Sequence, residues 1–141
     1  MIDIRIRAAA PSEAASVLAF WRESAEGTSI SDDVDGVERL LDRDPGALLL
    51  AVDGEVIVGS VIAGWDGWRA SLYRLAVLPS YRRRGISKAL LKAAEERFAT
   101  LGGRRADAMV LEANERAHHA WAAAGYVRQD TWRRWVKPFT E

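Results

Sequence analysis

The chain has no cysteine and only two histidines among its 141 residues. Without cysteine there is no disulfide framework, no thiol nucleophile and no thiolate metal site. Two histidines leave little scope for an imidazole site, so we expect no bound metal. The absence of disulfide chemistry indicates a cytoplasmic protein rather than a secreted disulfide-rich one.

Long apolar runs and an excess of one charge are also missing. The N-terminal residues alternate isoleucine with charged residues, which predicts neither a signal peptide nor a membrane-spanning helix. Lys and Arg number 20 and Asp and Glu also number 20, so the net charge indicates neither a nucleic-acid partner nor an anionic membrane. With 49% hydrophobic residues, a chain of this length can bury the core of one domain, which we expect to span residues 1–141.

The first part of the chain predicts one strand and two helices. Isoleucine occupies every second position from Ile2 to Ile6, which is the pattern of a strand with one buried face. Apolar residues at helical spacing then predict a helix over residues 11–27. After a polar loop at 28–33, a shorter helix is expected to end at Asp44.

Two Asp-Gly pairs organise the middle of the chain. Asp53-Gly54 and Asp66-Gly67 separate three strand-like runs. Because Asp-Gly between apolar runs is a strong hairpin signal, we expect an antiparallel meander. Its strands should cover residues 47–52, 55–65 and 68–78.

The last third predicts two helices and three strands. A helix over Ile86–Leu101 keeps an apolar stripe and is followed by a glycine pair suited to a C-cap. The next strand, 106–111, should lie parallel to residues 72–77, because a helical crossover joins them. Asn114 is expected to cap another helix, and two final strands are expected at 126–129 and 132–139.

The start of the helix at Ile86 carries an unusual concentration of positive charge. Arg82, Arg83, Arg84 and Lys88 gather where the helix dipole is also positive, and this costs roughly 0.3 to 1 kcal/mol for each cation. The arrangement becomes favourable when a multiply charged anion such as phosphate binds the free backbone N–H groups. Gly85 would let such a ligand approach the backbone closely. The alternative is a solvated basic helix start that acidic residues from elsewhere neutralise.

Two segments of the chain resemble motifs of the GCN5-related N-acetyltransferase (GNAT) family. Arg82-x-x-Gly85-x-Ser87, placed between a strand and a helix, resembles the Q/R-x-x-G-x-G/A segment that binds the pyrophosphate of acetyl-CoA. Ser87 departs from the usual Gly or Ala. The run from Asn114 to Tyr126 resembles the family's downstream motif, but Trp121 replaces a tyrosine that many relatives use as a general acid. An indole N–H donates a hydrogen bond but supplies no proton near neutral pH.

The resemblance implies an α/β (α+β) fold and a set of cofactor contacts. The expected fold is a single GNAT-like domain with a mixed, mostly antiparallel sheet of about seven strands, one parallel pair and about four flanking helices. A bulge near Leu75–Val77 should open the parallel pair for the pantetheine arm. The residues implied to bind acetyl-CoA are Leu75, Ala76, Val77, Arg82, Arg83, Arg84, Gly85, Ile86, Ser87, Lys88, Asn114 and Trp121.

Acetyl transfer to an amine also requires removal of a proton from that amine. Glu112, at the end of its expected strand, and Asp66, in a turn, are the candidate catalytic bases. A water relay or an amine that is already neutral would serve equally well. Backbone N–H groups near Leu75–Val77 would polarise the thioester carbonyl.

Three functions remain open at this point. The first is an acetyl-CoA-dependent N-acetyltransferase that acts directly on a primary amine of a small molecule or peptide. The second is a non-catalytic acyl-CoA-binding or sensor module on the same fold, which the replacement at Trp121 favours. The third, a nucleic-acid binder using Arg82–Arg84, is disfavoured by the neutral net charge. Residues 132–135 either form a homodimer contact or cover the core.

Overall fold

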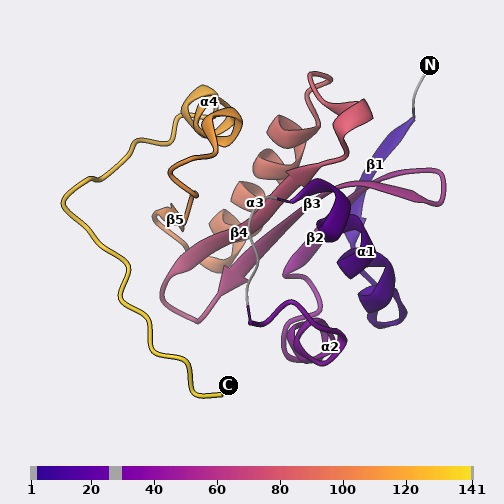
Figure 1. Cartoon of the computed structure of the whole chain (residues 1–141), viewed down its shortest axis with the longest axis horizontal. Coiled ribbons are helices and arrows are strands. Elements are labelled where there is room, and N and C mark those ends of the chain that lie inside the picture. The colour runs from indigo at the N-terminus through magenta and orange to yellow at the C-terminus, as the bar shows by residue number, and fades with distance from the viewer. Residues whose placement is uncertain (1–2, 26–29, 141) are drawn as a thin grey trace.

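The computed structural model describes residues 3–25 and 30–140, and within them five strands form one sheet flanked by four α-helices (Figure 1). The strands are β1 Ile4–Ala8, β2 Leu48–Asp53, β3 Val56–Trp65, β4 Ala70–Val77 and β5 Ala106–Ala108. The helices are α1 Ala14–Ser24, α2 Val34–Arg43, α3 Ile86–Leu101 and α4 Glu115–Ala123, with short 3-10 turns η1 at Pro11–Glu13 and η2 at Pro79–Tyr81. No described helix is both long and apolar enough to cross a membrane.

The predicted meander is confirmed. The sheet order is β1-β2-β3-β4-β5, and the neighbours from β1 to β4 are antiparallel. Gly54 and Gly67 have φ angles of 61° and 94°, so each Asp-Gly turn uses the left-handed conformation that glycine adopts without strain. Ile2 and Gly27, at the ends of two predicted elements, lie outside the described residues, as do residues 28 and 29 of the predicted loop.

The predicted parallel pair is also confirmed, but it is short. β5 pairs with β4 only where Ala106–Ala108 lie opposite Ala70–Leu72. β4 continues to Val77 with no β5 partner beside it. The pairing between the two strands therefore ends partway along β4. It ends on the side of the sheet where α4 follows β5 (Figure 1).

Helices cover both faces of the sheet. Successive side chains of β2 point to opposite faces and pack against different helices. Leu48 and Leu50 pack into a cluster with buried residues of α1 and α2. Ala51 points the other way, into a second cluster with buried residues of α3 and with Trp121 of α4. A strand that is buried on both faces reads as a continuous apolar run, as residues 47–52 do.

The expected sheet of about seven strands is wrong for the described residues, which form five. β5 ends at Ala108 rather than 111, and the strands expected at 126–129 and 132–139 are absent from the described chain. A β-strand depends on a neighbouring edge to pair with, and an isolated hairpin is marginal in water. β5 has only three residues, so it offers too short an edge for the apolar C-terminal residues to pair with.

The close approach of α3 to β3 depends on Gly59. A Cβ at this position would lie 2.9 Å from Ile86 Cγ2, 3.0 Å from Leu90 Cδ1 and 3.2 Å from Ala51 Cβ. Ile86 and Leu90 are themselves buried, so neither can move aside freely.

We therefore expect Gly59→Ala to lower the free energy of unfolding by about 1 to 3 kcal/mol through overpacking. Urea unfolding followed by circular dichroism measures this loss. Gly64→Ala, in the same strand, is the matched control, because its added Cβ would only reach Ser71 O at 3.4 Å. Equal losses in the two variants would contradict the proposed role of Gly59.

Candidate functional site

A bulge in β4 lies at the place where β5 has ended. Ser60 pairs with Ala76 and Ile62 pairs with Tyr73, so two residues of β4 stand opposite the single residue between Ser60 and Ile62. The two are Arg74 and Leu75, which places the bulge at the first residue of the predicted range, Leu75–Val77, and at the residue before it. Arg74 has a φ angle of 52°, a left-handed conformation that is uncommon for a residue with a side chain.

A buried hydrogen-bond relay holds this bulge. The indole of Trp21 in α1 donates to Ser60 Oγ at 3.0 Å, and the Ser60 hydroxyl donates to the backbone carbonyl of Arg74 at 2.8 Å. The Ser60 side chain is fully buried. Beyond the bulge, the Arg74 guanidinium forms an ion pair with Asp32 and lies over the Trp21 ring, 5.6 Å from its centroid. The left-handed residue is therefore fixed through both its backbone and its side chain.

A pocket of about 80 Å³ opens beside the bulge. Its wall combines the second half of β4 with the end of α1, the start of α3 and one face of α4. The lining residues are Ser24, Leu75, Ala76, Val77, Arg82, Ser87, Asn114, Arg116, Ala117 and Ala120. A wider hollow of about 240 Å³ at the start of α4 shares Asn114 and Arg116 with it, so the two hollows adjoin.

Arg82 ties two walls of the pocket together. Its Nε donates to Val77 O at 3.2 Å, and its Nη2 approaches Ser24 O at 3.5 Å. The guanidinium thus bridges the end of β4 and the last residue of α1. Because a helix C-terminus carries partial negative charge, a cation at this position is favourable.

The start of α3 lies next to Arg82 and carries no compensating acid. No side chain caps the helix, and no acidic residue occupies its first turn. Arg83, Arg84 and Lys88 have no carboxylate partner within 4.0 Å among the described residues. Arg83 and Gly85 have φ angles of 64° and 80°, and turns of this kind form concave backbone sites for anions. The neutralised helix start considered from the sequence is not what the described residues show.

One polar atom in the pocket wall is unsatisfied. Ser24 is 6% exposed, and its Oγ is the only buried side-chain oxygen or nitrogen in the described chain without a hydrogen-bond partner. Leaving a buried hydroxyl unpaired costs about 1 to 3 kcal/mol. Such groups are uncommon in folded proteins and mark places where a partner is missing.

Comparison with known proteins identifies the family. The profile of the acetyltransferase (GNAT) family matches residues 14–126, which include the bulge, the α3 start and α4. The chain belongs to this family. An acetyltransferase of Yersinia enterocolitica is 33% identical to the protein over 128 residues, or 91% of each chain.

Solved structures show the same fold. The PaiA N-acetyltransferase of Thermoplasma acidophilum, in complex with coenzyme A, aligns with a TM-score of 0.79 at 19% identity over 92% of each chain. The aminoglycoside 6′-N-acetyltransferase AAC(6′)-Ih of Acinetobacter baumannii aligns with a TM-score of 0.76 at 19% identity, covering 98% of this chain and all of its own. As a GNAT acetyltransferase, the protein uses acetyl-CoA as its cosubstrate.

The structure brings most of the predicted cofactor residues together. Leu75, Ala76, Val77, Arg82, Ser87 and Asn114 line the pocket. The residues of the basic turn and helix start adjoin it without lining it, namely Arg83, Arg84, Gly85, Ile86 and Lys88. Ile86 is 4% exposed and packs in the core, so only its backbone is available to a ligand.

Trp121 and Asn114 occupy different places. Trp121 is 8% exposed, packs in the core cluster and meets the Tyr126 ring edge-on at 5.0 Å between centroids. It does not line the pocket. Asn114 caps α4 as predicted, because its Oδ1 accepts from Ala117 N at 3.1 Å, and the same residue faces both hollows.

None of the three tyrosines of the chain lines the pocket either. Tyr73 is 49% exposed. Burial and a hydrogen bond to Glu95 raise the pKa of the Tyr126 phenol far above its usual value. A hydrogen bond to Asp53 raises the pKa of Tyr81. A raised pKa makes a phenol a weaker acid, so neither Tyr126 nor Tyr81 compensates for Trp121.

Asp66, the first candidate base, lies in the turn between β3 and β4. Its Oδ1 accepts the backbone N–H groups of Arg69 at 2.6 Å and of Trp68 at 2.8 Å. These hydrogen bonds lower the pKa of the Asp66 carboxyl. A lowered pKa makes a carboxylate a weaker base, and the turn does not line the pocket.

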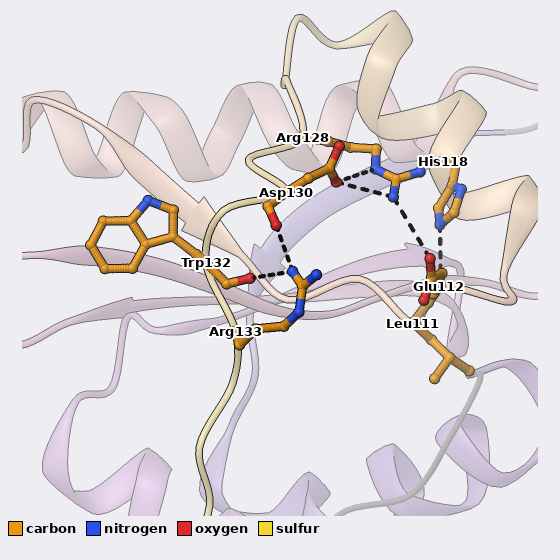
Figure 2. A network of polar contacts seen from close by, with 7 residues as sticks. All are labelled: Leu111, Glu112, His118, Arg128, Asp130, Trp132 and Arg133. Carbon is orange, nitrogen blue, oxygen red and sulfur yellow. Dashed lines mark hydrogen bonds and ion pairs between the residues drawn. The ribbon is translucent and has the colours of Figure 1, made fainter.

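Glu112, the second candidate, faces the C-terminal segment (Figure 2). Its side chain is 90% exposed, and Oε1 lies 3.8 Å from Arg128 Nη2. Arg128 in turn pairs with Asp130 at 3.1 Å. Glu112 does not line the pocket.

The described residues contain no group of three His, Asp or Glu side chains that could hold a metal ion.

Four residues that line the pocket were not among the predicted cofactor contacts, namely Ser24, Arg116, Ala117 and Ala120. Ser24 sits in a helix like any surface serine, and Ala117 and Ala120 lie on the apolar stripe of α4, which predicts packing against the core. Only the partial separation of β4 from β5 reveals that this stripe faces a pocket. Ala117 and Ala120 are half-buried rather than fully covered.

We expect Ser60→Ala to lower the free energy of unfolding by about 1 to 3 kcal/mol, because it leaves the Trp21 indole and the Arg74 carbonyl unpaired. Affinity for acetyl-CoA should fall as well, since the bulge loses its anchor. Chemical denaturation and calorimetric titration measure the two effects. Ser71→Ala, a serine of β4 outside the relay, is the control and should behave like wild type. A Ser60→Ala protein with wild-type stability would show that the relay does not hold the bulge.

Proposed function

We propose that the protein transfers the acetyl group of acetyl-CoA directly to a primary amine of a small molecule, within one catalytic domain spanning residues 1–141. The observation that carries this proposal is the uncapped, cation-bearing start of α3 beside a pocket under the β4 bulge. When bound, acetyl-CoA supplies an activated acetyl thioester. Residues of the chain would bind and orient the substrates and polarise the thioester, and solvent would carry the protons.

The start of α3 would hold the diphosphate. Free backbone N–H groups, the helix dipole and charged side chains all favour an anion there. Arg83, Arg84 and Lys88 supply the charge, and Ser87 adds a hydroxyl that faces the pocket. Arg82 contributes differently, since it fixes the geometry of the wall by bridging Val77 and Ser24.

The second half of β4 would align the pantetheine arm. Beyond Leu72 the strand has lost β5, so its backbone groups on that side can pair with the amides of an extended ligand. Backbone N–H groups at Leu75–Val77 would polarise the thioester carbonyl, and their positions are preorganised by the bulge. Holding donor and acceptor in line supplies part of the rate enhancement by itself.

Proton removal from the amine is assigned to water rather than to a side chain in contact with it. Asp66 and Glu112 remain the candidate carboxylates, and both lie outside the pocket wall, so either would act through a water relay. The departing thiolate receives no proton from Trp121, which is buried away from the pocket. Thiolate release with a solvent-derived proton is compatible with this arrangement.

A small-molecule acceptor is supported by a structural relative. The Acinetobacter baumannii protein with the same fold is an aminoglycoside 6′-N-acetyltransferase, and its whole chain aligns with this one. Family membership also favours catalysis over a non-catalytic acyl-CoA-binding module. A panel of primary amines, with release of CoA thiol as the signal, tests both points. The chain contributes no background to this assay because it contains no cysteine.

Charge reversal at the helix start tests the cofactor site. We expect the double change Arg84→Glu and Lys88→Glu to weaken acetyl-CoA binding more than tenfold, a loss of about 1.4 kcal/mol or more. Both side chains are exposed, so the free energy of unfolding should change little. Isothermal titration calorimetry at low salt measures the affinity. Arg104→Glu with Arg105→Glu, equal in charge change but beyond the other end of α3, is the control, and equal losses in both would count against the site.

We also infer that a second copy of the chain covers the C-terminal segment, residues 127–139. This segment exposes five large apolar side chains without packing them on its own domain, and patches of this kind are rare on monomers. The outer edge of β5 is unpaired in the described sheet, and a symmetric pair of copies would cover it together with the segment. The exposed residues are Val127 (87%), Trp132 (75%), Trp135 (93%), Val136 (70%) and Phe139 (93%).

Light scattering after gel filtration checks this inference. Wild type is expected to be a dimer at micromolar concentration, and Trp132→Ser with Trp135→Ser should convert it to a monomer. Trp68→Ser is the matched control, because Trp68 is 76% exposed but lies in the turn between β3 and β4. A monomeric wild-type protein would refute the dimer and leave the acetyltransferase proposal untouched.

A further inference from the structure

Ser24 lines the pocket and has no role in the reaction proposed above. It is the last residue of α1, and its hydroxyl is buried without a partner in the described chain. A serine in a helix commonly donates to the carbonyl four residues earlier, but Ser24 makes no such bond to Phe20. Its backbone carbonyl, by contrast, is approached by Arg82. The backbone of Ser24 thus has a hydrogen-bond partner, whereas its side-chain hydroxyl has none in the described chain.

The surroundings of Ser24 identify the part of a ligand that it would meet. Ser24 lines the pocket together with Leu75 of the bulge and with Ala76 and Val77 after it, and Arg82 bridges the carbonyl oxygens of Ser24 and Val77. The other lining hydroxyl, on Ser87, belongs to the helix start where the diphosphate is proposed to bind. Through the Arg82 bridge Ser24 lies beside the end of β4, along which the pantetheine arm is proposed to run, whereas Ser87 lies at the start of α3.

We take α4 to be the wall that moves when a ligand reaches the buried hydroxyl. This helix lines the pocket through Arg116, Ala117 and Ala120, and Trp121 is its only fully buried residue. Ala117 and Ala124 pack against the core but stay partly exposed, so α4 can shift when a ligand enters between it and β4. The ligand would then reach a hydroxyl that the empty pocket closes off.

We propose that the Ser24 hydroxyl hydrogen-bonds the reacting end of bound acetyl-CoA, namely the acetyl thioester and the adjoining pantetheine amide. This inference rests on the cofactor site proposed above. Both groups present carbonyl oxygens, which a neutral hydroxyl satisfies without introducing charge next to the thioester. Ser24 is a binding and positioning residue here, since its hydroxyl is far too weak an acid to protonate a thiolate.

The test compares two ligands that share a phosphate-bearing nucleotide but differ at the other end. Acetyl-CoA carries the pantetheine arm, and 3′-phosphoadenosine 5′-diphosphate lacks it but keeps all three phosphates. Ser24→Ala should weaken acetyl-CoA about tenfold by calorimetry, a difference of ~1.4 kcal/mol, and leave 3′-phosphoadenosine 5′-diphosphate unchanged. Ser87→Ala is the control, because an effect at the phosphate end, whatever its size, should be equal for both ligands.

A second readout separates this role from a structural one. A serine that stabilised the fold would lower the melting temperature when changed to alanine. Removing an unsatisfied buried hydroxyl should instead leave the melting temperature of the ligand-free protein equal or higher. The expected signature of Ser24→Ala is thus unimpaired stability combined with weaker acetyl-CoA binding.

The outcomes that overturn the inference are distinct from those that overturn the cofactor site. Unchanged acetyl-CoA affinity in Ser24→Ala, an equal loss for both ligands, or a lowered melting temperature of the ligand-free variant would each refute the role of Ser24. Failure of the wild-type protein to bind acetyl-CoA would refute the cofactor site itself. A raised KM for the amine with unchanged acetyl-CoA affinity would assign the hydroxyl to the acceptor instead and so refute this proposal.

Discussion

The site depends on one backbone distortion, the bulge at Arg74 and Leu75. A residue with a side chain in the left-handed region is strained, and such strain persists only where its surroundings enforce it. Here the Ser60 hydroxyl holds the Arg74 carbonyl, and the Trp21 indole holds Ser60, so a helix on one face of the sheet fixes the shape of a strand edge. The pairing of β4 with β5 stops at Leu72, and the pocket lies beside the bulge that follows.

The start of α3 contributes the second constraint. Its cations repel one another and the helix dipole, and the described chain provides no carboxylate for Arg83, Arg84 or Lys88. The tight contact between α3 and β3 at Gly59 fixes this charged helix end beside the end of β4. The start of α3 therefore combines an electrostatic cost, from its unpaired cations, with close packing against β3. This combination is typical of a binding site.

Local signals in the sequence were sufficient for the elements that surround the site. The Asp-Gly turns predicted the meander, and the apolar stripe with its glycine C-cap predicted α3 at the residues that the structure assigns, Ile86–Leu101. Features that depend on distant partners were not readable. The length of β5 and the absence of strands after α4 are decided by which edges pair. The partner of Ser60 is decided by a helix 39 residues away in sequence, and no pattern around Ser24 shows that its hydroxyl lacks a bond.

In the described part of the chain, three kinds of unpaired group lie at or beside one pocket. Among the described residues, three cations without a carboxylate partner lie at the start of α3, a hydroxyl without a hydrogen-bond partner lies in the pocket wall, and β4 has no parallel neighbour beyond Leu72. Each alone is a modest cost that a folded protein tolerates. A ligand with a diphosphate at one end, amides along its length and a carbonyl at the other would relieve all of them together. Acetyl-CoA carries these groups in this order. The unpaired groups of the ligand-free protein therefore match the cosubstrate of the family.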